Sequence, residues 1–230
     1  MSDELFKAID NEASIEEVKR ILEEHPEAVT AQDNDGWLPL HEALIAETSN
    51  EIIKMILEAN TDATKVQNND GDLPLHLAIY FKASNEIIEM IFEANPEATK
   101  EQDNDGSLPL HIALQKKASN EIIKMILHAN PDAVFGTEND MWMTPLHYAC
   151  YYKASKEVVQ ILIDAAQRSD SVAHVKHLPP PQRASAICSL PCKHGRTPLW
   201  YALHYNAPDC IVELLLVHYP LAGIMLENLH

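Results

Sequence analysis

Twelve histidines and four cysteines are the side chains of this 230-residue chain that are most able to do chemistry. Five of them fall in the pattern His174-x-x-His177 followed by Cys188-x-x-x-Cys192-x-His194. Thiolate sulfur and imidazole nitrogen are ligands that zinc prefers, so these five residues form a weak candidate zinc set. Their spacing matches neither a zinc ribbon nor a zinc finger, which favours a metal-free loop that is flexible or binds a partner. We therefore expect no metal and no cofactor.

Catalysis has little support in the sequence. Cys192 and His194 could act as a thiol nucleophile and its base, but two residues so close in a loop rarely reach that geometry. No orienting acid or oxyanion donor is recognisable nearby. The sequence also lacks glycine-rich phosphate loops, paired metal carboxylates in a motif and basic nucleic-acid patches. We expect the chain not to be an enzyme.

An internal repeat accounts for four of the other histidines. The motif Asp-Gly-x-Leu-Pro-Leu-His occurs at residues 35–41, 70–76 and 105–111, a spacing of 35. A fourth copy at 140–147 has one extra residue, a fifth at 194–200 is reduced, and the N-terminal residues keep matching positions. The period predicts six repeats in a single domain covering residues 1–230. Their expected boundaries are 1–34, 35–69, 70–104, 105–139, 140–193 with an insertion at 167–193, and 194–230.

Each repeat is expected to form a turn, a short helix, a loop and a longer helix. The Asp-Gly pair supplies the positive φ of a tight turn, and the proline that follows, such as Pro39, suits the first position of a helix. Ser49 and its equivalents are placed to cap the second helix, which carries apolar residues at helical spacing. Asn60, Asn95 and Asn130 are expected to be the left-handed residues that end this helix.

This pattern resembles the ankyrin-repeat family over nearly the whole chain. Leu-Pro-Leu-His stands in place of the family's Thr-Pro-Leu-His, with Ala43 two residues later and the helix Glu-Ile-Ile-Lys-Met-Ile-Leu-Glu at 51–58. The resemblance implies an all-α solenoid with structural histidines, since a residue repeated along a solenoid cannot form one site. The repeat is longer than the family's usual 33 residues, and only Thr144, beside His147, keeps the threonine that bonds the motif histidine. The other motif histidines therefore need different partners.

The fifth repeat contains an insertion of about 18 residues between Gln167 and Lys193. The run Pro179-Pro180-Pro181 removes three consecutive backbone donors and favours an extended chain. We expect this segment to be a long loop.

Charge is unevenly distributed along the chain. The net charge is −18, and residues 1–105 hold 25 acidic and 7 basic side chains, whereas residues 106–230 hold 10 of each. Such a surface disfavours nucleic acids and anionic membranes and would speed association with a basic protein partner. A simple solvated face is the alternative. An acidic N-terminus, sparse cysteines and no long apolar run indicate a soluble intracellular protein, cytoplasmic or nuclear.

The resemblance also implies where a partner would bind. In proteins that look like this one, partners usually lie across the concave side, on turn tips and on exposed positions of the first helices. Residues that differ between repeats at these positions set specificity, whereas shared residues build the core. The expected partner-binding residues are Trp37, Asp72, Tyr80, Phe81, Trp142, Tyr151, Tyr152, Arg196, His204 and Tyr205.

Aromatic residues are concentrated toward the C-terminus, where six of the seven tyrosines follow residue 147. Large aromatic side chains are common interface anchors. Some of them, especially Tyr148, Trp200 and Tyr201, could instead fill gaps between repeats. The apolar residues at 221–226 suggest either a fragment of a longer protein or an end that packs on its own loop, on a second copy or on a partner.

The leading functional prediction is a non-enzymatic scaffold that binds a protein partner on its concave face. The main alternative is a regulatory or targeting ankyrin domain of a larger multidomain enzyme, and continuation of the native reading frame past His230 would distinguish the two. A third hypothesis is a metal-stabilised nucleic-acid or redox sensor centred on residues 174–194. The acidic balance argues against nucleic acid.

Overall fold

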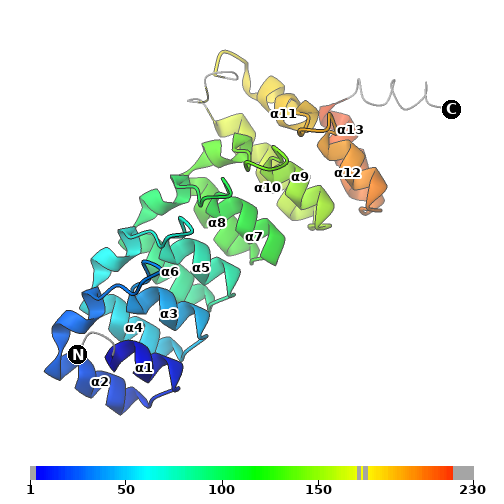
Figure 1. Cartoon of the computed structure of the whole chain (residues 1–230). Helices are drawn as coiled ribbons and strands as arrows, with labels where there is room; N and C mark the ends of the chain where they lie inside the picture. The colour runs from blue at the N-terminus through cyan, green and yellow to red at the C-terminus, as the bar shows by residue number, and fades with distance from the viewer. Residues whose placement is uncertain (1–3, 170–171, 173–175, 220–230) are drawn as a thin grey trace. The chain divides into compact units, whose positions relative to one another are not determined.

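The computed structural model describes residues 4–169, 172 and 176–219, and within them every regular element is a helix. In these described residues, thirteen α-helices and four short 3₁₀ helices follow one another (Figure 1). They form two compact parts, which we call the N-terminal half, residues 1–104, and the C-terminal half, residues 105–230. No helix of the described residues is long and apolar enough to span a bilayer.

The N-terminal half contains three repeats, each with a first helix, a second helix and a 3₁₀ turn. In order these are α1 (Glu4–Asp10), α2 (Ile15–Glu24), η1 (Pro26–Thr30), α3 (Pro39–Ile45), α4 (Asn50–Ala59), η2 (Thr61–Lys65), α5 (Pro74–Tyr80), α6 (Asn85–Ala94) and η3 (Pro96–Lys100). The first helices α1, α3 and α5 lie side by side in that order, and so do the second helices α2, α4 and α6.

The C-terminal half continues the pattern with one additional helix. Its elements are α7 (Pro109–Lys116), α8 (Asn120–Ala129), η4 (Pro131–Phe135), α9 (Pro145–Tyr151), α10 (Lys156–Arg168), α11 (Pro180–Ser189), α12 (Pro198–His204) and α13 (Asp209–His218). The first helices are α7, α9 and α12, which contact one another in sequence, while α8, α10 and α13 form the row of second helices.

Local sequence signals explain where most helices begin. From the second repeat onward, every first helix starts at the motif proline, whose missing N–H would be unbonded at that position anyway. A serine caps the second helix in five repeats; Ser84 Oγ, for example, accepts a hydrogen bond from the Ile87 N–H at 3.3 Å. The glycine of the turn has a positive φ, 76° at Gly36, as the Asp-Gly pair predicts. In the fourth motif, which has no glycine, Trp142 takes this conformation with φ 55°.

The motif histidine is fully buried, and in the second and third repeats it connects the first helix to the residue that follows the 3₁₀ turn. The Nδ1 of His41 accepts a hydrogen bond from the Leu38 N–H at 3.0 Å, and its Nε2 lies 3.1 Å from the Val66 carbonyl oxygen. In the fifth repeat, Nδ1 of His147 is contacted by both the backbone N–H and the hydroxyl of Thr144. The leucine that replaces threonine therefore removes the hydroxyl contact but not the backbone one.

The prediction that the asparagine after the second helix is left-handed is wrong. Asn60, Asn95 and Asn130 have φ between −149° and −138°, and a 3₁₀ helix that the sequence analysis does not anticipate follows each of them. In the N-terminal half the asparagine amide instead donates to a carbonyl of the preceding repeat, as from Asn95 Nδ2 to Thr64 O at 2.8 Å. Its side chain thus satisfies buried backbone between repeats, which a local signal cannot reveal.

Six further left-handed residues of the described part of the chain lie in the loop between the first and second helices. They are Glu12, Glu47, Lys82, Lys117, Lys153 and Asn206, with φ between 51° and 58°. This conformation ends the first helix and turns the chain toward the second.

The prediction of an extended loop in the insertion is also wrong for residues 180–189, which form α11. Pro180 and Pro181 occupy the first turn of the helix, where proline is tolerated, and the buried Ala184, Ile187 and Cys188 form one apolar face. The helix contacts α10, α12 and α13. The insertion therefore adds a buried interface to the C-terminal half.

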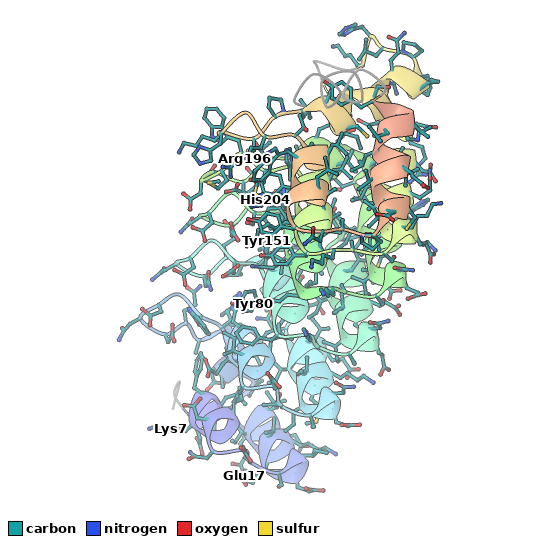
Figure 2. All side chains as sticks on the ribbon, turned by 90° about the vertical axis from the view of Figure 1, so that its right-hand side faces the viewer. Lys7, Glu17, Tyr80, Tyr151, Arg196 and His204 are labelled. Atoms are coloured by element: carbon teal, nitrogen blue, oxygen red, sulfur yellow. The ribbon has the colours of Figure 1, made fainter. Side chains whose placement is uncertain are left out.

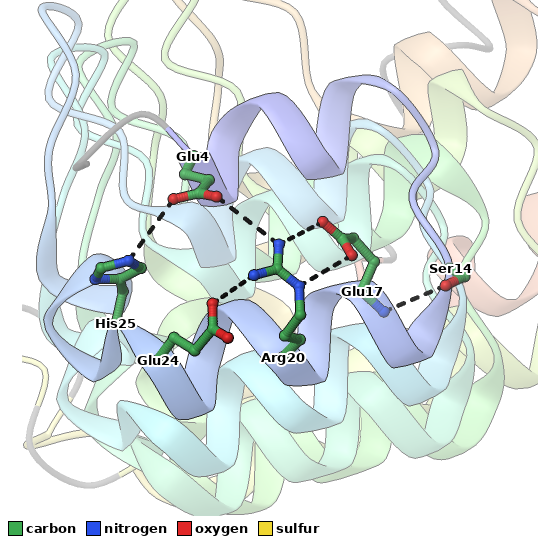
Figure 3. Close-up of polar contacts among 6 residues, drawn as sticks. All are labelled: Glu4, Ser14, Glu17, Arg20, Glu24 and His25. Carbon is green, nitrogen blue, oxygen red and sulfur yellow. Dashed lines mark hydrogen bonds and ion pairs between the residues drawn. The ribbon is translucent and has the colours of Figure 1, made fainter.

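An ion-pair cluster joins the first two helices of the chain (Figure 3). The guanidinium of Arg20 on α2 bonds Glu17 at 2.8 Å and Glu24, and lies 3.9 Å from Glu4 at the start of α1. His25 approaches the same Glu4 carboxylate at 3.9 Å. The hydrogen bond from Arg20 lowers the pKa of Glu17. These groups remain in contact with solvent, so their main effect is to orient α1 against α2 rather than to add much stability.

Candidate protein-binding surface

A ladder of aromatic rings runs along the first helices of the C-terminal half. We define the aromatic ladder as Tyr148, Tyr151, Tyr152, Trp200, Tyr201, His204 and Tyr205, which lie on or directly after α9 and α12. Residues three and four apart lie on the same face of a helix. Because α9 and α12 are neighbours, the rings on this face of α9 lie beside the rings at the equivalent positions of α12. The repeat register itself builds the ladder.

Tyr151 lies at the centre of the ladder and contacts three other rings. Its ring centroid is 4.5 Å from that of Tyr205, 4.8 Å from Tyr152 and 6.2 Å from Tyr201, all in edge-to-face geometry. Tyr201 and Tyr205 stack with an interplanar angle of 11°. These distances and angles are those that aromatic pairs favour, so the rings fix one another's orientation.

A cationic group closes one end of the ladder. Trp200 stacks on His204 with centroids 4.4 Å apart, and the Arg196 guanidinium carbon lies 4.0 Å from the Trp200 ring centroid. Arginine over an indole ring is a favourable cation–π contact. Figure 2 shows Tyr151, His204 and Arg196 in order along the same side of the ribbon.

Contacts with buried residues fix the core side of the ladder. Tyr201 is 3% exposed, and burial raises the pKa of its hydroxyl to about 12. That hydroxyl lies 3.7 Å from Cys192 Sγ, and the Tyr201 ring packs edge-on against His147, 5.6 Å away. On the α7 side, the Gln115 amide donates to the Tyr152 hydroxyl at 3.3 Å. Tyr201 therefore belongs to the core, as the gap-filling alternative predicts.

The opposite side of the ladder is exposed to solvent at Tyr151 and His204. Tyr151 is 38% exposed, His204 is exposed, and Tyr152 and Tyr205 are half-buried. Leu203 of α12 is 41% exposed, although the residues equivalent to it in the preceding repeats are buried. Comparing the repeats could have identified Leu203, because its equivalents in the earlier repeats are core positions. In the described part of the chain no further first helix packs on α12 to bury it.

The structure brings half of the predicted partner-binding residues together. Tyr151, Tyr152, Arg196, His204 and Tyr205 join in the aromatic ladder, directly or through Trp200. The other five predicted residues lie outside the ladder.

Four of those others lie in the N-terminal half, and the fifth lies in a turn of the C-terminal half. Tyr80 is 44% exposed and its ring lies 5.1 Å from that of Phe81. Trp37 and Asp72 are half-buried in turns, where their backbone N–H groups bond Asp33 and Asn68. Trp142, also in a turn, is 55% exposed.

The candidate zinc residues are not assembled by the part of the chain that the structure describes. His174 lies outside the described residues, and His177 and His194 are exposed. Cys188 is buried within α11 and Cys192 is buried beside Tyr201, and no three histidine, cysteine or acidic side chains of the described residues are grouped to hold a metal ion. Burial raises the pKa of Cys188 to about 12 and also raises that of Cys150, which disfavours reactive thiolates.

The apolar residues 221–226 lie outside the described residues. Nearby, Val217 of α13 is 73% exposed.

Comparison with known proteins is consistent with this architecture. A chain from the structure of the predatory endopeptidase Bd0816 from Bdellovibrio bacteriovorus in complex with immunity protein Bd3460 has a TM-score of 0.68 and 19% identity, covering 92% of this chain and 95% of that one. The ankyrin repeat protein EF0377 has a TM-score of 0.71 and 20% identity, covering 95% and 98%. No curated protein sequence matches the chain.

The family comparison is more direct. A model of three ankyrin repeats matches residues 5–101, 45–135, 83–173 and 138–224, which together cover most of the chain. Together with the helical repeats, these matches confirm the all-α ankyrin-repeat fold expected from the motifs. The chain belongs to the ankyrin-repeat family.

Proposed function

We propose that this chain is a non-enzymatic scaffold that binds a protein partner, and that the aromatic ladder forms the centre of the interface. The ladder lies on the row of first helices, where the resemblance to ankyrin-repeat proteins leads us to expect the partner. The observation that carries the proposal is the unbroken series of ring contacts from Tyr152 through Tyr151 and Tyr205 to Trp200 and His204.

The family supports a binding role. Ankyrin repeats are generally protein–protein interaction modules. One of the structures that this chain resembles contains an endopeptidase together with an immunity protein, which is a complex between two proteins. A protein partner is therefore the first class to test.

The ladder has the physical properties of an interface centre. Its rings are already held in place by one another, so binding would immobilise few side chains and lose little conformational entropy. Tyrosine and tryptophan combine a large apolar area with a polar group at the edge, and such residues dominate measured binding energies. Tyr151 and His204 offer both features at the exposed edge of the ladder.

Other predicted residues would extend or supplement this surface. Trp142 belongs to the C-terminal half, while Trp37, Asp72, Tyr80 and Phe81 belong to the N-terminal half, whose excess of acidic side chains favours a basic partner.

The buried reactive groups fit a binding role better than a catalytic one. His147 uses both ring nitrogens in contacts with the protein itself, to Thr144 and to the Arg196 carbonyl. The thiols of Cys150 and Cys188 are buried and hard to ionise. These side chains stabilise the repeats rather than face a substrate.

Site-specific photocrosslinking in the native cell tests the proposal. The photoreactive amino acid p-benzoylphenylalanine would replace Tyr151 in the ladder or, as a matched control, Lys156, which is exposed at the start of α10. We expect a discrete protein to crosslink to position 151 and not to position 156. The same crosslinked proteins from both positions, or none from position 151, would contradict the proposal.

A further inference from the structure

An open groove lies between the first two repeats, on residues that the aromatic ladder does not use. It measures about 610 Å³, within the size range of pockets that hold ligands, roughly 300 to 1,000 Å³. It lies where the loop between α1 and α2 meets the loop between α3 and α4. Its lining residues come from two segments, residues 8–16 and 46–52.

Two residues that line this groove depart from the repeat pattern. Ala46 follows α3 at the position where the later repeats have Phe81, Lys116, Tyr152 and Tyr205. A methyl group therefore stands where every later repeat has a large side chain. In the N-terminal half, Phe81 lines the next such pocket, which is only about 200 Å³.

Ile15 is the second departure. It is the first residue of α2, and the first residue of the other second helices is Asn50, Asn85, Asn120, Lys156 or Asp209. Ile15 is 40% exposed. This apolar side chain stands at a position that is otherwise polar and lines the groove, so it adds apolar surface that a ligand in the groove would cover.

The floor of the groove is apolar and its rim is acidic. Ile9 and Ile52 are buried beneath it. Glu12, Glu16 and Glu47 stand around it, all exposed, and no lysine or arginine lines it. Among the described residues none of these three carboxylates is in an ion pair. The carboxylates therefore remain available to an incoming cation.

Two of these glutamates share one backbone conformation. Glu12 and Glu47 are the left-handed residues of their loops, with φ 52° and 51°. Because the repeat places these residues one above the other in register, their side chains flank the groove from both repeats. A left-handed conformation is costly for residues other than glycine, so local preference does not explain glutamate here.

We propose that this groove binds a cationic amphipathic segment of a protein partner. One aliphatic or aromatic side chain of the segment occupies the space above Ile9 and Ile52, next to Ile15. Lysine or arginine side chains beside it pair with Glu12, Glu16 and Glu47. An uncharged apolar segment would desolvate these carboxylates without compensation, whereas a purely cationic one would leave the apolar floor in water. Charge complementarity therefore selects a segment with both features.

Selection from a phage-displayed library of random twelve-residue peptides tests the proposal with the full chain. We expect selection to enrich peptides that combine lysine or arginine with an aliphatic or aromatic residue. Their affinity, measured as fluorescence anisotropy of the labelled peptide, should fall as salt rises, because exposed ion pairs are screened.

Three variants locate the binding, and the repeats themselves supply the templates. Ala46→Phe installs the side chain of the third repeat and should fill the groove, and Ile15→Asn restores the residue of that repeat. Glu12→Gln with Glu47→Gln removes the rim charge. Each should weaken the selected peptides by roughly tenfold or more, a loss of about 1.4 kcal/mol.

The matched control is Lys116→Phe, which places the same side chain at the equivalent position two repeats later and should leave affinity unchanged. Circular dichroism at 222 nm verifies that each variant is folded. Selection of no peptide, selection of peptides without basic residues, or peptides whose affinity survives Ala46→Phe would overturn the proposal.

Discussion

The motif histidines His41, His76 and His147 use both of their ring nitrogens in the architecture. In the second repeat, Nδ1 of His41 accepts from the Leu38 N–H while Nε2 faces the Val66 carbonyl, so Nε2 carries the proton. A neutral ring supplies one acceptor and one donor, which fits these partners. A protonated ring has two donors and no acceptor, and it would lose the bond from Leu38. The fold therefore requires these histidines to be neutral.

This requirement predicts that stability falls at acidic pH. Burial lowers the pKa of His41, His111 and His147 to about 4, whereas an unfolded histidine has a pKa of about 6.5. Between these values the unfolded chain binds more protons than the folded one. The stabilisation is therefore complete above pH 6.5 and is lost as pH falls toward 4, by up to about 1.4 kcal/mol per pH unit for each histidine.

Urea denaturation at several pH values between 7 and 4.5 measures this slope. The variant His147→Gln should be less stable at pH 7 but show a shallower pH dependence, because one proton-linked group is gone. The matched control His204→Gln alters an exposed histidine and should retain the wild-type slope. A slope that His147→Gln leaves unchanged would show that His147 is not linked to folding.

At the scale of elements, one polar side chain supplements the apolar packing of α11. The Arg183 guanidinium donates to the carbonyl oxygens of Leu178 at 2.9 Å and Lys176 at 3.2 Å, and also to Ser169 and Gln167 at the end of α10. Ser169 in turn donates to Asp132 of η4. Arg183 thus ties together both ends of the segment that leads from α10 to α11.

Replacing Arg183 should loosen α11 and leave the repeats intact. Arg183→Lys keeps the charge but cannot reach several carbonyls at once, because its ammonium is a point donor. We expect about 2 kcal/mol of lost stability from the missing charged hydrogen bonds, with faster amide hydrogen exchange confined to residues 178–190. Arg168→Lys, an equally conservative change at the end of α10, serves as the control. Unchanged exchange in α11 would mean that its apolar face alone holds it.

Sequence signals predict the repeat elements well but not the insertion. Proline at the first helical position and serine at the N-cap act through their own backbone, so they predict helix starts without knowledge of the fold. The apolar face of α11 lies at Ala184, Ile187 and Cys188, a helical spacing visible in the sequence, yet the preceding prolines suggest an extended chain. Contacts with α10 and α13 provide the surface on which this helix packs.

The left-handed asparagine fails as a prediction for a related reason. Its side-chain amide donates a hydrogen bond to a carbonyl oxygen of the preceding repeat, as Asn95 does to Thr64. Only the tertiary structure reveals that partner.

At the scale of the whole molecule, differences between repeats carry the functional information. Comparing repeats position by position picks out the ladder residues Tyr151, Tyr152 and Tyr205, because the other repeats do not all have aromatic rings at these positions. The comparison does not predict how the rings contact one another, nor that Tyr201 supports them from the core. Those features depend on the spacing between α9 and α12, which the sequence does not encode locally.

We expect the two proposed surfaces to contribute separately to recognition. The groove of the N-terminal half is defined by Ala46, Ile15 and an acidic rim, and the ladder of the C-terminal half by aromatic rings and Arg196. Variants at one surface should therefore leave the affinity measured at the other unchanged, since residues without shared contacts usually act additively.

The most direct test of the scaffold proposal is the binding free energy of the partner identified by crosslinking, measured by isothermal titration calorimetry. Replacing Tyr151 and Tyr205 together with alanine should weaken binding by more than about 1 kcal/mol, roughly fivefold in Kd. Tyr205→Phe, which keeps the ring, and Lys156→Ala on α10 should retain wild-type affinity. Full affinity in the Tyr151→Ala, Tyr205→Ala variant, with the fold intact by circular dichroism, would contradict the account.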